Sequence, residues 1–99
     1  MKDRIEVKYN DLQRMGTTFS KSSDSVDRMT NEIRSHMDRL RASWEGVAEK
    51  KFFEEMEREV LPALKRLSTA MDRASDTTKQ LTQLFQQAET EASSQFKQT

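Results

Sequence analysis

Hydrophobic residues recur at every seventh position along the first half of the chain. The row consists of Leu12, Phe19, Val26, Ile33 and Leu40. Met37 and Trp44 continue the apolar pattern towards the middle of the chain. A seven-residue repeat of this length is typical of a helix that packs lengthwise on another helix. We therefore predict a first helix over about residues 11–42.

The residues before this helix follow a different pattern. Charged and apolar side chains alternate through Arg4–Tyr9, which favours an extended lead-in at residues 1–9. Asn10 can cap the helix, and Gln13 can reach back to it. The stretch Gly16–Ser25 contains poor helix formers, so the sequence leaves an interruption open. We expect one continuous helix, because the row keeps its phase through that stretch.

The second half of the chain repeats the pattern from Val47 onward. Its main row contains Phe53, Val60, Leu67, Ala74, Leu81 and Ala88, and neighbouring positions add Met56, Leu64 and Met71. We predict a second helix over about residues 47–90 and a flexible polar tail at residues 91–99. Pro62 lies inside this helix and removes one backbone hydrogen bond. The apolar phase continues across it, so we expect a kink, with a split helix as the alternative.

The segment 43–47 joins the two predicted helices. Gly46 has no Cβ, so it can adopt the positive φ that lets the chain reverse. Trp44 can pack beside the turn while its indole N–H finds a polar partner. On residue types alone, both residues are explained by a structural role in the turn, with Gly46 as a helix cap and Trp44 packed beside it.

Reversal at this turn brings the two helices together as an antiparallel hairpin, with Phe19 opposite Ala70 and Met71. The predicted hairpin and dimer core consists of Leu12, Phe19, Val26, Ile33, Met37, Leu40, Phe53, Met56, Val60, Leu64, Leu67, Met71 and Leu81. Two helices cannot cover so wide an apolar stripe, and burial of each large side chain contributes ~1.5–3 kcal/mol. We therefore predict a single all-α domain over residues 1–99, a hairpin with heptad-type packing that dimerises into a four-helix bundle.

Composition narrows the function classes. The chain has 17 basic and 17 acidic residues, which gives no general basis for binding nucleic acid or an anionic membrane. It has no cysteine, and we expect its single histidine, His36, to be a partly buried packing residue and not a metal ligand. The carboxylates are scattered and there is no Gly-rich phosphate loop, so we expect no enzyme, cofactor or metal.

Hydropathy bears on the location of the protein. No hydrophobic run approaches the length of a membrane span, and the residues after Met1 form no apolar signal core. We therefore expect synthesis in the cytoplasm without a cleaved signal peptide, and no stable membrane insertion. An export route would have to read another feature of the chain.

A 99-residue helical hairpin with Trp-x-Gly at its bend resembles the WxG family of early-secreted-antigen-like proteins, which are substrates of bacterial type VII secretion. Trp44 and Gly46 match the motif, and the resemblance covers nearly the whole chain. The family also has a C-terminal export signature, whose spacing is matched by Phe85, Glu89, Ala92 and Phe96. The better-known short form of that signal begins with Tyr, and this chain has Phe85 there.

The four signature positions share one face of a helix. A receptor groove could read Phe85 and Phe96 as anchors and Glu89 as the charged discriminator. The alternative is that Phe85 belongs to the core and that the tail is inert.

The resemblance implies a small non-enzymatic protein that a type VII system exports as a folded helical dimer and that acts as a secreted partner, carrier or effector. The implied partners are a second copy or a paralogous WxG hairpin, the secretion ATPase through the C-terminal segment, and a larger effector. Two alternatives stay open. One is a cytosolic adaptor that pairs with the helical N-terminal region of a larger secreted effector, and the other is a filament or needle-type subunit.

Overall fold

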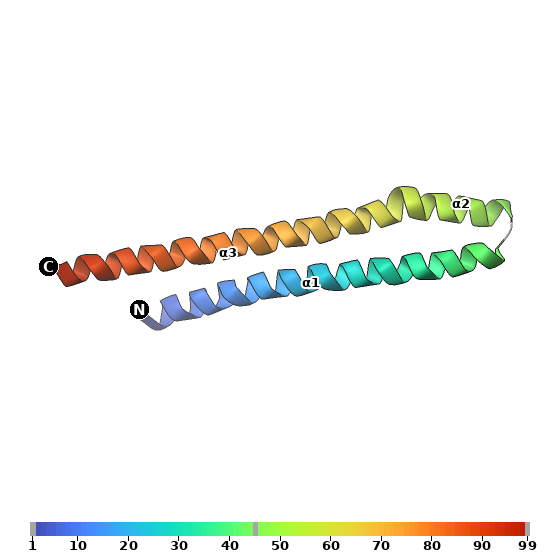
Figure 1. Ribbon diagram of the computed structural model, residues 1–99. Helices are drawn as coiled ribbons and strands as arrows, with labels where there is room; N and C mark the ends of the chain where they lie inside the picture. The colour runs from blue at the N-terminus through green and yellow to red at the C-terminus, as the bar shows by residue number, and fades with distance from the viewer. Residues whose placement is uncertain (1, 45, 99) are drawn as a thin grey trace. The chain divides into compact units, whose positions relative to one another are not determined.

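The computed structural model describes residues 2–44 and 46–98, and the surroundings of the side chains of residues 6–44 and 46–94. All regular structure in these residues is helical (Figure 1). Helix α1 spans Lys2–Ser43, α2 spans Val47–Glu55, and α3 spans Leu61–Gln98. Between α2 and α3 lies one π-helical segment, η1, at Met56–Val60.

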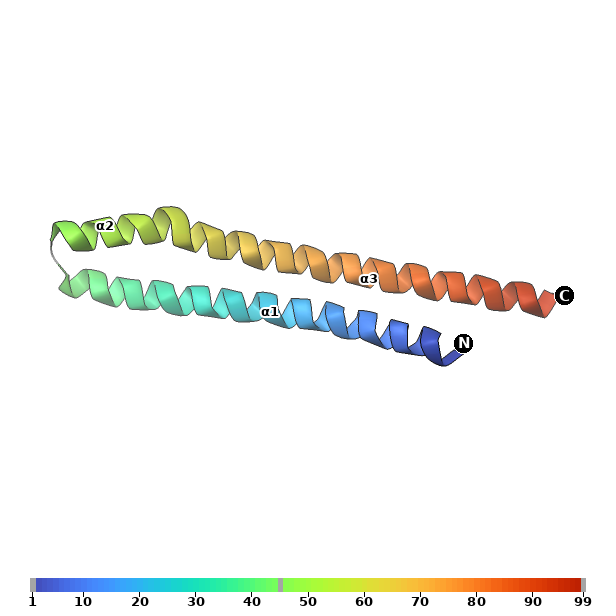
Figure 2. The ribbon, with the colours of Figure 1, turned by 180° about the vertical axis from the view of Figure 1, so that it is seen from behind.

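Two compact units make up the chain. The turn unit is Lys21–Met71, and the terminal unit combines Met1–Ser20 with Asp72–Thr99. Within each unit, a stretch of α1 runs antiparallel to a stretch from the second half of the chain, as both ribbon views show (Figures 1 and 2). The predicted all-α helical hairpin is therefore confirmed.

The helices are longer than the sequence analysis expected. The predicted extended lead-in is wrong, because α1 already begins at Lys2. Ile5 lies seven residues before Leu12, so the apolar row itself extends into this segment. The Gly16–Ser25 stretch does not interrupt α1. At the other end of the chain, the predicted flexible tail is helical, because α3 continues to Gln98. Residues 91–98 include no Gly or Pro that would end the helix.

Small and hydroxyl side chains line the interface between the helices. In the turn unit, Ser23 and Ser68 are each 1% exposed, and Ser23 Oγ donates to the Ser68 carbonyl at 3.2 Å. Ser68 Oγ in turn donates to Asp27 Oδ1 at 2.6 Å. In the terminal unit, the buried Ser75 donates to the Gly16 carbonyl at 3.0 Å. Each buried hydroxyl therefore has a polar partner, which removes the penalty for burying it.

The buried residues keep the seven-residue repeat, in rows that differ from the predicted ones. We call these buried rows the seam rows. They contain Gly16, Ser23, the half-buried Thr30 and Met37 on α1, and Leu61, Ser68, Ser75 and Thr82 on α3. Val60, Leu67 and Leu81, which belong to the predicted hairpin and dimer core, are 36%, 44% and 51% exposed in the single hairpin. We call Val60, Leu67, Ala74 and Leu81 the outer row.

The remaining predicted core residues occupy two environments. Met37 and Phe53 are buried. The half-buried ones are Leu12, Phe19, Val26, Ile33, Leu40, Met56, Leu64 and Met71. The buried hydrophobic cluster of Met37, Phe53 and Leu61 lies entirely in the turn unit. Among residues 6–20 and 72–94 of the terminal unit the buried positions are Gly16, Ser75, Thr78 and Thr82, so this interface relies on small and hydroxyl side chains.

The π-helical segment explains why the predicted row leaves the seam of the hairpin. Phe53 is buried, and the next seam residue, Leu61, follows eight residues later and not seven. The Leu61 N–H bonds to the Met56 carbonyl, five residues back, so η1 accommodates one extra residue. A row continued from Phe53 at a spacing of seven therefore reaches Val60 and remains one position out of phase.

Pro62 directly follows this segment. A proline ring crowds the carbonyl four residues before it, and proline has no N–H to donate. A wider π turn relieves that crowding, and the ribbon broadens between α2 and α3 (Figure 1). The helical backbone continues through Pro62, so the split helix is excluded.

The same insertion moves the pairing of the helices by one residue. The predicted register would place Ser23 opposite Arg66 and Leu67. The structure pairs Ser23 with Ser68. The shift places a hydroxyl, and not a leucine, in the narrow space between the helices.

We expect Ser68→Leu to lower the free energy of unfolding by about 1–3 kcal/mol, because it overfills the seam and removes the bond to Asp27. Thr69→Leu is the matched control, since Thr69 is exposed, and its effect should stay within about 0.5 kcal/mol. Urea unfolding followed by circular dichroism at fixed protein concentration measures both. Equal effects of the two variants would contradict the small-residue seam.

Candidate functional site

The turn is built around Gly46. Helix α1 closes with the Trp44 N–H bonded to the Leu40 carbonyl at 2.9 Å, and α2 opens with Lys50 N–H bonded to the Gly46 carbonyl at 3.2 Å. Gly46 has φ 155° and ψ 172° and is the N-cap residue of α2. Only glycine adopts this backbone region readily. The predicted positive φ is present, although Gly46 caps the start of α2 and not the end of α1.

Three aromatic side chains gather beside this turn. Trp44 lies edge-on to Phe52 and Phe53, with ring centroids 5.8 and 6.1 Å away. The Arg41 guanidinium covers the Phe53 ring at 4.8 Å, which is a cation–π contact. Phe53 is buried, whereas Trp44 and Phe52 are 43% and 40% exposed. The arrangement stabilises the turn and leaves parts of two aromatic side chains exposed.

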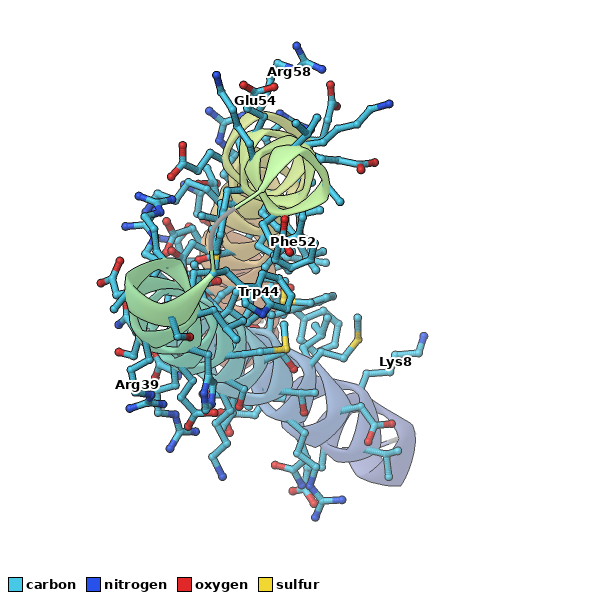
Figure 3. The ribbon with its side chains drawn as sticks, turned by 90° about the vertical axis from the view of Figure 1, so that its right-hand side faces the viewer. Lys8, Arg39, Trp44, Phe52, Glu54 and Arg58 are labelled. Atoms are coloured by element: carbon cyan, nitrogen blue, oxygen red, sulfur yellow. The ribbon has the colours of Figure 1, made fainter. Side chains whose placement is uncertain are left out.

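An end-on view shows how these side chains are directed. Trp44 and Phe52 lie side by side between the helices of the turn unit (Figure 3). Glu54 of α2 and Arg58 of η1 point away from α1. The turn unit therefore has an aromatic side and a charged side.

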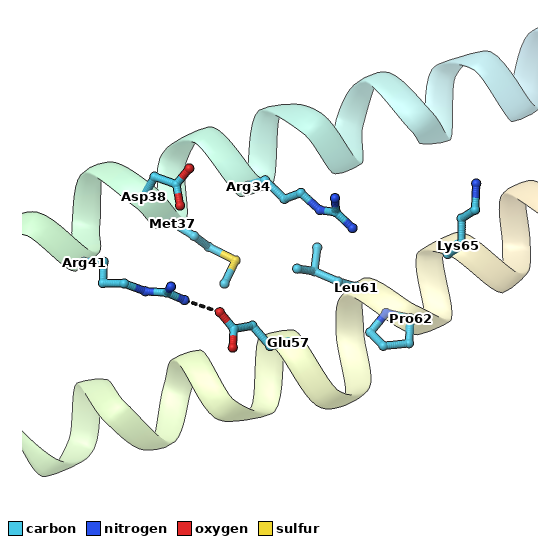
Figure 4. A pocket seen from close by; sticks show the side chains of 8 residues that line it. All are labelled: Arg34, Met37, Asp38, Arg41, Glu57, Leu61, Pro62 and Lys65. Atoms are coloured by element: carbon cyan, nitrogen blue, oxygen red, sulfur yellow. Dashed lines mark hydrogen bonds and ion pairs between the residues drawn. The ribbon is translucent and has the colours of Figure 1, made fainter.

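A hollow of about 520 Å³ lies next to the π segment in the turn unit (Figure 4). It is lined by Arg34, Met37, Asp38, Arg41, Glu57, Leu61, Pro62 and Lys65. Arg41 forms an ion pair with Glu57 across it. Both side chains are about half exposed, so this pair contributes little to stability. The hollow combines an apolar floor with charges of both signs.

His36 does not have the environment that the sequence analysis expected. It is exposed, and Arg39 donates to its Nδ1 at 2.8 Å. The prediction of a partly buried packing residue is wrong, because His36 lies one position before the seam residue Met37. Among the described residues, no group of His, Cys, Asp and Glu side chains could hold a metal ion.

The predicted export residues occupy the last part of α3. Phe85 is half-buried, and Glu89 and Ala92 are exposed. Phe96 belongs to α3, but its side chain lies outside the described ones. Glu89 and Phe96 continue the seam row at seven-residue steps from Thr82. This segment is thus the continuation of the face that packs on α1, and α3 extends past the start of α1 (Figures 1 and 2).

A second group of residues near Glu89 was missed by sequence reasoning. Glu6, Tyr9 and Asn10 from α1 and Gln86 and Glu89 from α3 line one hollow of about 350 Å³ in the terminal unit. The alternating pattern of residues 4–9 predicts an extended segment, which gives no reason to place Tyr9 beside Glu89. The seven-residue step from Tyr9 to Gly16 is the signal that could have placed Tyr9 on the seam side of α1.

Fold and turn together define a helical hairpin protein of the Trp-x-Gly type, and comparison with protein families agrees. The family model WXG100, proteins of 100 residues with WXG, matches residues 4–90. The chain belongs to the WXG100 family, as its resemblance indicated. No curated protein and no solved structure matches the chain.

Members of this family are known as small secreted proteins of type VII systems and are not known as enzymes. They typically form dimers of helical hairpins. In the part of this chain that the structure describes, none of the helices is both long and apolar enough to cross a bilayer.

The two glycines provide a matched test of the turn. We expect Gly46→Ala to lower the free energy of unfolding by about 1–3 kcal/mol, because alanine is strained at this φ. Gly16 lies inside α1, where an added Cβ would meet Thr78 Cγ2 at an ordinary 3.6 Å. Gly16→Ala should therefore be neutral or stabilising by up to about 1 kcal/mol. Thermal and urea unfolding measure both changes.

An added Cβ at Gly46 would also meet the Glu49 carboxylate. The double variant Gly46→Ala/Glu49→Ala removes that clash and keeps the backbone strain. It should remain destabilised. If it regains the wild-type stability, backbone strain at Gly46 is not what the turn requires.

Proposed function

We propose that this protein is a small non-enzymatic partner protein that a bacterial type VII system exports as a folded dimer of hairpins. Membership of the WXG100 family supports the export route. The single observation that carries the dimer is the exposed outer row, since Val60, Leu67 and Leu81 stay 36–51% exposed within the hairpin.

Several exposed apolar residues share one side of the seam. Met15 and Met29 on α1 each precede a seam residue, as do Leu67 and Leu81 on α3. In an antiparallel pair, the positions that precede the seam rows on the two helices flank the same edge of the interface. We call this the apolar edge. It is present in each unit, on residues whose burial contributes ~1.5–3 kcal/mol each.

The opposite edge carries polar side chains. The residues four positions after the seam residues are Ser20, Asp27, Arg34 and Arg41 on α1, and Lys65, Asp72, Lys79 and Gln86 on α3. We call this the polar edge. A hairpin with one apolar and one polar edge favours a single further partner over stacking on both sides. Those features support a closed four-helix bundle more than a filament.

A second copy of the chain is the partner that these observations favour. Equal numbers of acidic and basic residues mean that two copies carry no net repulsion. A paralogous hairpin remains the alternative partner. In either case the apolar edge is covered, and the last turns of α3, with Glu89 exposed, stay available to the secretion ATPase.

We expect a bacterium with an intact type VII system to release the protein into the medium, and one with an inactivated secretion ATPase to retain it. Light scattering should give the purified exported protein twice the 11.6 kDa chain mass over a range of concentrations. Retention in both strains would contradict export and support the cytosolic adaptor. If the purified chain is monomeric and folds only when another chain is added, the bundle is a heterodimer.

The outer row can be tested in the same measurement. Leu67→Asp should convert the dimer to monomer, because it places a charge in the apolar edge. Thr69→Asp introduces the same charge at an exposed position two residues away and should leave the mass unchanged. A dimer that tolerates Leu67→Asp must use another surface.

A further inference from the structure

Two adjoining hollows lie on the polar edge of the terminal unit. The smaller, of about 350 Å³, is the one lined by Tyr9 and Glu89. The larger, of about 560 Å³, also includes Tyr9 and Gln86 and extends to Lys79 and Thr82. Tyr9 and Gln86 therefore form the wall between the two hollows, and each hollow is lined from both helices.

The smaller hollow has a defined chemistry. Its charged side chains are the carboxylates of Glu6 and Glu89, and its other members are a phenol and two amides. Tyr9 is half-buried, and its hydroxyl accepts a hydrogen bond from Gln13 Nε2 at 3.2 Å. The phenol proton is then free for an acceptor, and the ring is held beside the carboxylates. A guanidinium group fits these features, because it pairs with carboxylates and stacks on an aromatic face.

The hollow lies away from the apolar edge. Glu6 and Gln86 occupy polar-edge positions, whereas Met15 and Leu81 mark the other edge in the same unit. A second hairpin that covers Met15 and Leu81 leaves the hollow open. The exported dimer would therefore carry it on its surface.

We propose that Tyr9 is a specificity-determining residue of the export signal, so that the recognition surface combines α1 and α3. An arginine side chain of the secretion machinery enters the hollow between Tyr9 and Glu89. This inference rests on the proposed function, because Glu89 is its link to export. It moves the signal from one face of the last turns of α3 to a composite surface that exists only when the hairpin is folded.

Export of the full chain from an intact type VII strain tests the proposal, with the ratio of protein in the medium to protein in cells as the readout. Glu89→Gln should lower that ratio at least about tenfold by removing the charged acceptor. Tyr9→Phe should lower it about threefold or more. Glu89→Asp keeps the charge and should recover most of the export. Glu91→Gln is the matched control, since Glu91 is exposed on the same helix and does not line the hollow.

Circular dichroism and light scattering on each variant separate recognition from folding. The Tyr9 hydroxyl bonds only to the exposed Gln13 among the described residues, so Tyr9→Phe should keep the wild-type helicity and mass. A double Tyr9→Phe/Glu89→Gln variant should be no worse than Glu89→Gln alone, because both side chains serve one contact.

The outcomes distinguish this inference from the function on which it rests. If Glu89→Gln blocks export and Tyr9→Phe does not, the composite surface is wrong and the export signal stands. If neither variant lowers export of a protein that does leave the cell, both the signal and the composite surface are wrong. If the wild-type chain is not exported at all, the proposed function is wrong and the inference fails with it.

Discussion

The hydrogen bonds that join Ser23, Ser68 and Asp27 are the contacts on which the rest of the structure depends. They are made by small side chains between two helices, and they satisfy hydroxyls that would otherwise be buried without a partner. Outside the buried cluster of Met37, Phe53 and Leu61, these small positions leave the larger apolar residues off the seam. They remain half-buried or exposed along one edge, where they can pack on a second hairpin. The pairing of Ser23 with Ser68 therefore has two consequences. It places hydroxyl side chains between the helices, and it leaves apolar side chains along one edge of the hairpin.

The π turn before Pro62 sets that register. With a regular helix the buried Phe53 would be followed in the seam by Val60 and Leu67, and the two helices would be held apart by branched side chains. The extra residue in η1 brings Leu61 and Ser68 inward and turns Leu67 outward. Proline at position 62 therefore does more than bend the helix. It favours the wide turn that buries one row of α3 within the hairpin and leaves the next row exposed.

The sequence was sufficient to predict the hairpin, its turn and its family, because these depend on long periodic rows and on Trp44 and Gly46. It placed the second row one position out of phase, since a spacing of seven through Phe53, Val60 and Leu67 is also apolar and hides the insertion. Ser23 falls in the stretch of poor helix formers, and nothing in the sequence marks Ser68 or Ser75 as interface positions, because single residues do not reveal that two hydroxyls will face each other. Tyr9 was missed for a related reason: an alternating segment of six residues fits a strand as well as the end of a heptad row.

Disulfide trapping tests the central claim most directly, because the chain has no cysteine of its own. The Oγ atoms of Ser23 and Ser68 lie 3.3 Å apart, so the double variant Ser23→Cys/Ser68→Cys should form a bridge within one chain under mild oxidation, seen as a mobility shift on a non-reducing gel and as an unchanged chain mass. Ser23→Cys/Leu67→Cys is the comparison, because Ser23 would face Leu67 if the helix had no π turn. This double variant should form few disulfides within a chain. If the Leu67 pair closes within the chain and the Ser68 pair does not, the seam and the outer row have been assigned the wrong way round.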